Sequence, residues 1–322
     1  MPSGTTPQQA PRAEPGSRTC SLGVSTAAIL ASLCSLGVLS AGCNSFAVSA
    51  DAAPAGGAVV QTFPRPFQII AHRGASAQAP ENTLAAFRAA RAMGIVEVEL
   101  DVQLSADDGV LLFHDDSLER KTGQPGRVRD YSLETLRGFE IGSWFDSTHP
   151  GAGERFAGTP LDSLEQLFEA LGTSLFYHVE LKDAEPELPG QVLALVDRFA
   201  LRERVLITSF RFEQLERVRV LAPELPTCLL IGRPERREGS VEDWIDRAAA
   251  AGMREVGVVA SEIRVEQVRY ARARGLWIRA WGVKNVDDMD HAIAVGSNGM
   301  TLDWPEKLVA RWLEARGTPG AR

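Results

Sequence analysis

From residue 67 onward, short β-rich runs alternate with stretches of helical periodicity, and this alternation constrains the fold more than any other feature of the chain. Such alternation is typical of βα units, which assemble into a parallel sheet covered by helices. A representative helical stretch is NTLAAFRAARAMG, where Leu84, Phe87 and Ala90 fall on one stripe and Gly94 follows as a C-cap. The candidate strands are nine runs at 68–71, 96–102, 110–114, 174–182, 205–210, 227–231, 256–260, 276–283 and 299–303.

The gap between the second and third runs differs from the others, because only the short segment LSADDG separates them. A crossover helix does not fit there, so these two runs are expected to form an antiparallel hairpin. A turn near Asp107 and Asp108 predicts that Asp101 lies roughly opposite His114. Without the return strand, eight parallel strands remain, the number that closes a (β/α)8 TIM barrel. We therefore predict an α/β barrel with a β-hairpin extension after the second strand.

Polar side chains gather at the carboxyl ends of the predicted strands, where the active sites of such barrels lie. They are His72 and Arg73 after the first strand, Glu99 and Asp101 in the second, and Glu180 and Lys182 in the next barrel strand. Glu99, Asp101 and Glu180 form an all-oxygen set, which suits a hard divalent cation, Ca²⁺ or Mg²⁺. The alternative is a group of carboxylates neutralised by Arg73 and Lys182 alone.

Two separate arguments bring His72 and His114 to the same rim, and such a pair suits a general acid and a general base. Arg73 and Lys182 supply positive charge for a phosphate or carboxylate. Metal, histidines and cations together favour hydrolysis of a phosphodiester. Paired carboxylates could serve a glycosidase, but that chemistry leaves the histidines without a task. The remaining histidines are expected to be packed or surface residues: His149, His178 and His291.

The N-terminal part of the chain differs in kind from the rest. No charged residue occurs from Thr19 to Ala50, and the apolar run in this span is long enough for a secretory signal. LSAGC at 39–43 resembles a lipoprotein processing site at which Cys43 is lipidated. Cleavage after VSA at 48–50 and an uncleaved anchor are the alternatives. All three predict an exported domain that is periplasmic, held on the cell envelope as a lipoprotein, or secreted.

These features divide the chain into four parts: an export signal or lipoprotein leader at 1–50, a flexible linker at 51–66, a barrel domain at 67–316 and a disordered tail at 317–322. Cys228 is alone in the barrel domain, so no disulfide is expected within it. The formal net charge of −8 argues against a nucleic-acid partner. A membrane is expected as a partner only through the N-terminal lipid or an uncleaved anchor.

Several separated motifs together resemble the glycerophosphodiester phosphodiesterase family. They are HRGASAQAPENT at 72–83, ELDVQLSADDGVLLFHDDSL at 99–118, ELK at 180–182, TSF at 208–210, WGV at 281–283 and GMTLDWP at 299–305. The resemblance covers essentially all of 67–316 and implies a barrel enzyme that cleaves small-molecule glycerophosphodiesters to glycerol phosphate and an alcohol. It also implies that the glycerol 2-hydroxyl attacks phosphorus to give a cyclic phosphate, which water then opens.

The same resemblance implies roles for individual residues. His72 and His114 match the acid and base pair of the family, and Glu99, Asp101 and Glu180 match its metal ligands. Arg73 and Lys182 match phosphate contacts. The walls that receive the glycerol are matched by Trp281, Phe210 and Phe145.

Two positions depart from the family pattern, because Lys284 stands where Asn is usual and Asn298 where Asp is common. Lys284 is expected either to act as a second cationic contact or to point to solvent. Glu97 has no counterpart in the motif and is expected to form a structural salt bridge. Two other functions stay open: a phosphoinositide-cleaving phospholipase of related barrel architecture, and a non-catalytic exported protein that binds glycerophosphodiesters.

Overall fold

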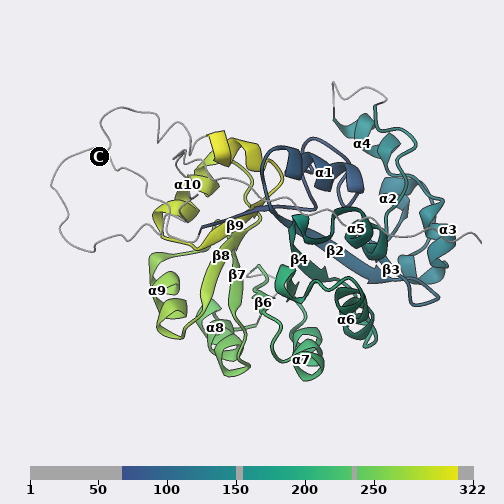
Figure 1. Ribbon diagram of the computed structural model, residues 1–322. Coiled ribbons are helices and arrows are strands. Elements are labelled where there is room, and N and C mark those ends of the chain that lie inside the picture. Colours follow the sequence, from purple (N-terminus) through teal and green to yellow (C-terminus); the bar gives the residue numbers. More distant parts are fainter. Residues whose placement is uncertain (1–66, 150–154, 234–237, 311–322) are drawn as a thin grey trace, which may run out of the picture. The chain divides into compact units, whose positions relative to one another are not determined.

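The computed structural model describes residues 67–149, 155–233 and 238–310 (Figure 1). The predicted leader at 1–50 with Cys43, the predicted linker at 51–66 and the predicted tail at 317–322 lie outside the described residues. Among the helices of the described ranges, none is both long and apolar enough to cross a membrane.

Eight parallel strands close into a barrel, which confirms the fold predicted from the sequence. They are β1 (Gln68–Ala71), β2 (Glu97–Leu104), β4 (Phe176–Leu181), β5 (Val205–Ser209), β6 (Thr227–Leu230), β7 (Glu255–Val259), β8 (Trp277–Trp281) and β9 (Gly299–Leu302). Each strand of the ring pairs with the next in chain order, and β1 pairs with both β2 and β9. This double pairing of β1 closes the ring.

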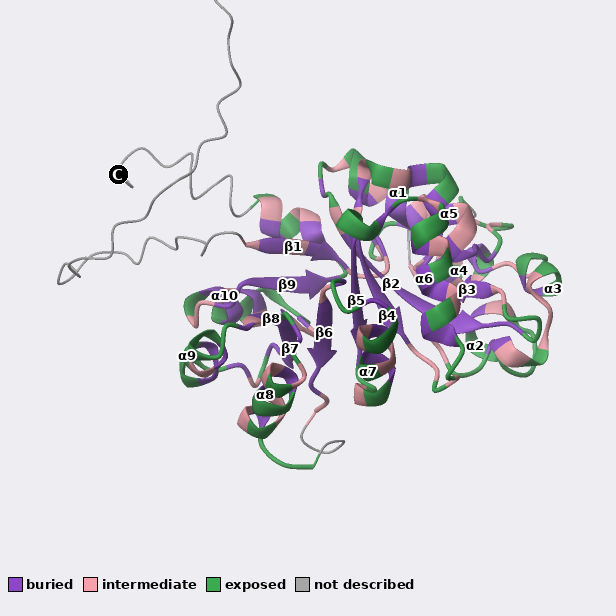
Figure 2. Ribbon diagram, turned by 60° about the horizontal axis from the view of Figure 1, so that its bottom comes forward, coloured by how far each residue is buried: buried purple, intermediate pink, exposed green. Residues whose placement is uncertain are grey.

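Helices surround the barrel, with exposed outer faces over buried strands (Figure 2). The longer ones are α1 (Leu84–Ala92), α5 (Leu164–Leu171), α6 (Leu188–Arg198), α7 (Phe212–Leu221), α8 (Val241–Ala250), α9 (Val265–Ala273) and α10 (Val286–Ala294). Single 3₁₀ turns, η2 (Gly172–Ser174) and η3 (Arg202–Arg204), precede β4 and β5. Four of these longer helices have an N-cap residue whose side chain accepts a backbone N–H of the first turn: Thr83, Ser163, Ser240 and Asn285.

A long excursion follows the hairpin strand β3 (Val110–Leu112) and has its own small core. It contains α2 (Glu119–Thr122), η1 (Val128–Asp130), α3 (Leu133–Arg137) and α4 (Gly142–Thr148), which lie together beside the barrel (Figure 1). Leu111 and Phe113 from the return strand and its continuation pack there against Leu118 and Leu136. The excursion is thereby anchored to the segment that carries His114.

The hairpin register differs by one residue from the predicted one. β2 and β3 pair antiparallel as expected, but the N–H of Phe113 donates to the carbonyl of Asp101 at 3.0 Å. Phe113, and not His114, therefore lies opposite Asp101. The turn explains the difference, because the loop at 106–108 has three residues and Asp108 adopts a φ of 61°. A three-residue loop with one left-handed residue replaces the two-residue turn that the prediction assumed.

Side chains on β2 alternate between the helices and the barrel interior. Val98 and Leu100 join the main hydrophobic core, and the acids between them face the other way. Nε2 of His178, a fully buried residue of β4, donates to Glu97 at 2.9 Å. His178 is therefore packed as predicted. It pairs with Glu97, for which the sequence analysis expected a salt bridge without naming the partner.

Candidate active site

Three carboxylates converge at the carboxyl ends of β2 and β4. Asp101 lies opposite Glu180 in the parallel register, and Glu99 precedes Asp101 on the same face of β2. One oxygen of each side chain lies within 4.8 Å of the others, and all three residues are buried. The structure thus brings together the three predicted metal ligands, which we call the acidic cluster.

The donor atoms of the acidic cluster fit a hard cation. Glu99 Oε1 and Asp101 Oδ1 are buried without a hydrogen-bond partner. Burial, and then the charge of Asp101, raise the pKa of Glu99 to about 8, because negative charge is in excess here. Carboxylate oxygens this close together, with unused lone pairs, match the ligand set of Ca²⁺ or Mg²⁺.

Two basic side chains neutralise part of the acidic cluster. Arg73 Nε lies 3.1 Å from Asp101, and Lys182 Nζ donates to Glu180 at 2.8 Å. Although burial opposes ionisation, the charges of Arg73 and Lys182 hold the pKa of Asp101 well below its usual value. Glu99 accepts only the backbone N–H of Arg73, at 3.0 Å, within the described residues. Arg73 and Lys182 therefore pair with two of the three acids, and Glu99 has no hydrogen bond from a basic side chain among the described residues.

His72 follows β1 and lies next to the acidic cluster. Its Nε2 is 3.8 Å from Glu99, and its Nδ1 lies 2.5 Å from Asp303, the residue after β9. Burial and the charge of Arg73 lower the pKa of His72, but the hydrogen bond to Asp303 and the charge of Glu99 outweigh them and raise it above 6.5. The carboxylate of Asp303 thus orients the ring and favours its protonated form.

His114 reaches the site from the hairpin side. Its Nδ1 lies 2.9 Å from Asp115, which also accepts from Arg120 and from Lys121. Burial opposes ionisation of Asp115, but the hydrogen bond from His114 and the charge of Lys121 hold its pKa well below the usual value. Lys121 is itself fully buried and also contacts Glu81. His114 therefore has a carboxylate behind its ring, as His72 does.

The turn after β1 places Arg73 by means of an unusual backbone. Arg73, Gly74 and Asn82 all have positive φ, at 56°, 81° and 57°. In this conformation Arg73 donates through its guanidinium to Glu81 at 2.8 Å. Asn82 donates through Nδ2 to Asp101 at 2.9 Å and accepts the Asp101 N–H at 3.1 Å. The turn therefore orients Asp101 through Asn82, and it also supplies the predicted basic side chain, Arg73.

The sequence analysis gave no chemical role to five polar residues that complete the site: Glu81, Asn82, Asp115, Lys121 and Asp303. Four of them lie inside the motifs quoted from the sequence, so the motifs themselves were the signal that could have found them. Lys121 lies outside those motifs, and only its burial and contacts show its position in the site.

A cavity of about 1160 Å³ opens at the barrel mouth. Its wall includes five predicted site residues: His114, Glu180, Lys182, Phe210 and Trp281. The rings of Phe210 and Trp281 meet edge to face with their centres 5.0 Å apart. The structure therefore brings these two predicted walls together beside a metal ligand and a predicted catalytic residue.

Phe145, the third predicted wall, is not brought to the cavity. Its side chain is 1% exposed, stacks on His149 with ring centres 3.9 Å apart, and meets Phe156 edge to face. It therefore packs within the excursion, at a position where substrate contact would require exposure of a buried ring. His149 is a packed residue, as predicted.

The two residues that depart from the family pattern belong neither to the acidic cluster nor to the cavity wall. Asn298 is buried and its side chain accepts the backbone N–H of Ile278, so it joins the last two barrel strands. Lys284 is exposed and does not belong to the cavity wall, which favours the solvent-directed alternative.

The fold and the site define a (β/α)8 barrel enzyme. Residues 72–307 match the model of the glycerophosphoryl diester phosphodiesterase family, and the chain therefore belongs to this family. A glycerophosphodiester phosphodiesterase of Caldanaerobacter subterraneus is 33% identical over 245 residues, which cover 75% of this chain and 96% of the relative. One of Bacillus subtilis is 30% identical over 281 residues, covering 84% and 94%. The predicted family is confirmed.

Solved structures show the same fold. A phosphodiesterase of Oleispira antarctica, solved in complex with the product sn-glycerol-3-phosphate, is 27% identical and superimposes with a TM-score of 0.66, covering 78% of this chain and 97% of that one. A glycerophosphodiester phosphodiesterase of Agrobacterium tumefaciens is 26% identical with a TM-score of 0.64, covering 76% and 99%.

Proposed function

We propose that this chain hydrolyses small-molecule glycerophosphodiesters to glycerol phosphate and an alcohol, with a divalent cation, Ca²⁺ or Mg²⁺, held by the acidic cluster. The observation that carries the proposal is the convergence of Glu99, Asp101 and Glu180 within 4.8 Å, beside His72 and at a cavity lined by His114. The names of the curated relatives and the glycerol phosphate bound to the Oleispira antarctica protein support this substrate class.

Charge at the site suits a phosphodiester. When bound, a divalent cation in the acidic cluster stabilises the negative charge that develops on the phosphate oxygens. Arg73 and Lys182 already point cationic nitrogens at the acidic cluster, and they add charge-assisted hydrogen bonds to the same oxygens. The edge-to-face pair of Phe210 and Trp281 forms an apolar wall for the glycerol carbons.

The two histidines are prepared for proton transfer in the same way. Nδ1 of each faces a carboxylate, Asp303 for His72 and Asp115 for His114, which leaves Nε2 to exchange a proton. One histidine accepts the proton of the glycerol 2-hydroxyl as its oxygen attacks phosphorus. The other protonates the alcohol oxygen as its bond to phosphorus breaks. Water then opens the cyclic phosphate with the two roles exchanged, which restores both rings.

The proposal is tested by release of glycerol phosphate from glycerophosphoglycerol with Ca²⁺, with Mg²⁺ and after chelation. Chelation is expected to abolish turnover, and His72→Gln and His114→Gln are each expected to lower kcat by about 10²- to 10⁴-fold. His291→Gln is the matched control, because His291 contacts the carbonyl of Ile263 outside the site. Full turnover in both site variants would refute the acid and base assignment. No release from any head group would favour the binding-protein alternative.

We further propose, on the sequence alone, that 1–50 exports the domain and that Cys43 is lipidated. Mass spectrometry of the mature N-terminus separates the alternatives. A diacylglyceryl group on an N-terminal Cys43 is expected, and Cys43→Ser should release the protein from the membrane fraction. A mature N-terminus at Asp51 would instead show cleavage after VSA at 48–50, and it would contradict lipidation of Cys43.

A further inference from the structure

Two carboxylates beside the acidic cluster, Glu81 and Asp115, each share one oxygen between two nitrogen donors. Oε1 of Glu81 accepts from Arg73 at 2.8 Å and also from Nζ of Lys121. Oδ1 of Asp115 accepts from Nζ of Lys121 and from Nδ1 of His114, each at 2.9 Å. These contacts join the proposed phosphate contact to a proposed proton-transfer residue in one chain, and Lys121 is its central link.

The ammonium group of Lys121 is enclosed on all sides. The side chain is 0% exposed, and Nζ lies 5.4 Å from the ring centres of Phe113 and Trp144. Aromatic faces attract a cation, but the strong acceptors of this ammonium group among the described residues are Glu81 and Asp115. A desolvated ammonium group keeps such counter-charges close. It therefore fixes the distance between the two carboxylates.

The donor atoms around Lys121 are arranged as they would be around a metal ion. One donor atom from each of Glu81, His114 and Asp115 lies within 4.8 Å of the others. Nζ of Lys121 already contacts two of these three residues. The protein itself thus supplies a cation to this group, and a covalently held cation stays in place at any concentration of free ions.

The two histidines differ in how they are tied to Arg73. His72 precedes Arg73 in the chain, so the backbone already sets their separation. Its carboxylate partner, Asp303, has a side chain that is 53% exposed and accepts further only from the hydroxyl of Ser76, at 3.2 Å, within the described residues. His114 comes from the return arm of the hairpin and has no covalent link to the turn after β1. Its position relative to Arg73 therefore depends on side-chain contacts.

We propose that Lys121 is a positioning residue that fixes His114 relative to Arg73. The inference rests on the proposed function, in which the guanidinium binds the phosphate and the imidazole moves a proton at the same phosphodiester. Both groups then have to meet one phosphorus centre in a single geometry, and an error of about 1 Å in such a geometry can cost about 100-fold in rate. Lys121 provides this precision without touching the substrate.

The test is Lys121→Ala, assayed with glycerophosphoglycerol at a temperature where circular dichroism shows the variant folded. We expect kcat to fall because His114 is less well held and KM to rise because Arg73 is, which together lower kcat/KM by about 10- to 100-fold. The space left by the side chain adjoins Asp115, which lines the cavity, so a small amine can enter. Propylammonium replaces the atoms that are lost and should restore both parameters in a saturable manner. Propanol fills the same space without charge and should not.

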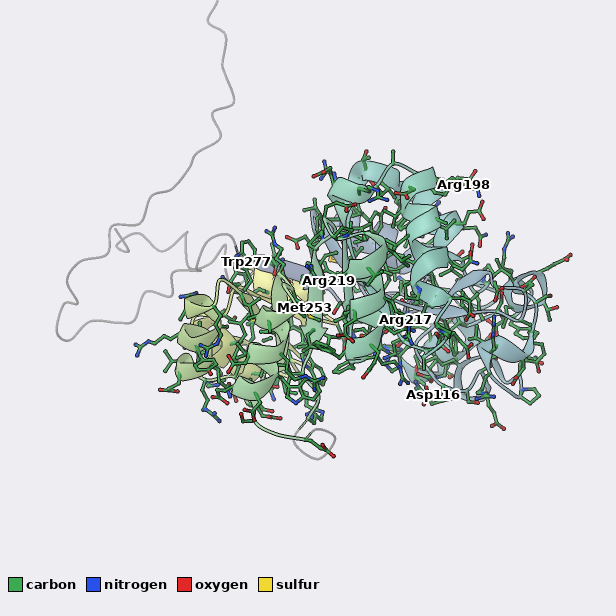
Figure 3. The ribbon with its side chains drawn as sticks, turned by 90° about the horizontal axis from the view of Figure 1, so that it is seen from below. Asp116, Arg198, Arg217, Arg219, Met253 and Trp277 are labelled. Atoms are coloured by element: carbon green, nitrogen blue, oxygen red, sulfur yellow. The ribbon has the colours of Figure 1, made fainter. Side chains whose placement is uncertain are left out.

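Arg254→Ala is the matched control, because Arg254 is also a basic residue over a tryptophan ring, that of Trp277, at 4.9 Å. Trp277 lies well apart from Asp116, which follows Asp115 in the chain (Figure 3). This control should keep the wild-type kcat and KM and should not respond to propylammonium.

Two results would overturn the role of Lys121. One is an unchanged kcat and KM in the folded Lys121→Ala variant. The other is a recovery with propylammonium that is no larger than the recovery with propanol. Failure of the proposed function is separate from both, since it would show as no turnover of glycerophosphoglycerol by the wild type.

Discussion

Asn82 links the turn after β1 to the acidic cluster through two hydrogen bonds to Asp101, one to its carboxylate and one from its backbone N–H. Asn82→Asp keeps the size of the side chain and tolerates the φ of 57°, but it places a second carboxylate against Asp101. Cation affinity and kcat/KM are expected to fall by about 10- to 100-fold. Calorimetric titration with Ca²⁺ and the dependence of kcat/KM on Ca²⁺ measure both effects.

Asn82→Gly is the control for this substitution, since glycine tolerates the positive φ and removes the hydrogen bonds without adding charge. It should cost less cation affinity than Asn82→Asp. Wild-type affinity in the aspartate variant would show that Asn82 does not act on Asp101.

Lys121 is a fully buried cation between two carboxylates, Glu81 and Asp115, which in turn hold Arg73 and His114. Lys121→Met preserves the apolar stem and takes one basic partner from each of two partly buried acids. Because charge-assisted hydrogen bonds at partly buried carboxylates are lost, we expect the free energy of unfolding to fall by about 1–3 kcal/mol. Urea unfolding measures the change. Arg198→Gln removes the exposed pair with Glu165 and should cost about 0.5 kcal/mol or less, and equal losses in the two variants would contradict the argument.

Residue types and their order in the chain were enough to predict the histidines, the acidic cluster and its two bases, because polar groups at strand ends have few structural uses. The sequence motifs contain Asp115 and Asp303, but the pairing of each carboxylate with a histidine was not predictable in this way. His72 and Asp303 are separated by 231 positions and meet only because β1 pairs with β9. The sequence also did not show which way Phe145 faces: it lies on the short helix α4, where its side chain is buried and packs on His149.

At the scale of elements, the turn between β1 and α1 approaches the helix closely. Gly74 has a φ of 81°, and a Cβ there would lie 2.7 Å from the backbone of Ala86. Gly94, at the end of α1, has a φ of 79° and open space around it. Gly94→Ala therefore measures the cost of the backbone conformation alone, about 1 kcal/mol. Gly74→Ala adds a clash with helix backbone and should cost roughly 1–3 kcal/mol more.

Because Gly74 follows His72 and Arg73, the same clash should also displace the turn that carries them. We expect kcat/KM to fall in Gly74→Ala and to be retained in Gly94→Ala, with thermal unfolding and kinetics measured on both. Equal stability of the two alanine variants would show that α1 moves to accept the methyl group.

The strands were predictable as elements because runs buried on both faces are apolar and β-rich, but the hairpin register was not. Register depends on the conformation of the loop, and Asp108 takes a left-handed φ that lengthens the turn to three residues. The same residues could also form a two-residue turn at Asp107 and Asp108, so the sequence does not distinguish the two loops. The sequence pattern therefore predicted which strands pair. The backbone conformation of the loop shifts their register by one residue.

At the scale of the whole molecule, closing the ring brings the carboxylates of two strands together, and this concentrates negative charge that the unfolded chain keeps apart. A cation that binds only the folded barrel therefore stabilises it. At a concentration 100-fold above Kd, the gain is about 2.7 kcal/mol. For a domain of this size that corresponds to an increase in Tm of roughly 5–10 °C with Ca²⁺ or Mg²⁺.

Glu99→Gln tests whether this stabilisation arises at the acidic cluster. Glutamine can still accept the N–H of Arg73, but it removes one of the three charges, so Tm without cation should be equal or higher and most of the cation-induced increase should be lost. Glu165→Gln, on the outer surface, should retain the full increase. Differential scanning calorimetry with and without chelator measures all three proteins. If neither cation raises the Tm of the wild type, no cation binds the folded barrel. A full increase in Glu99→Gln would place the cation outside the acidic cluster.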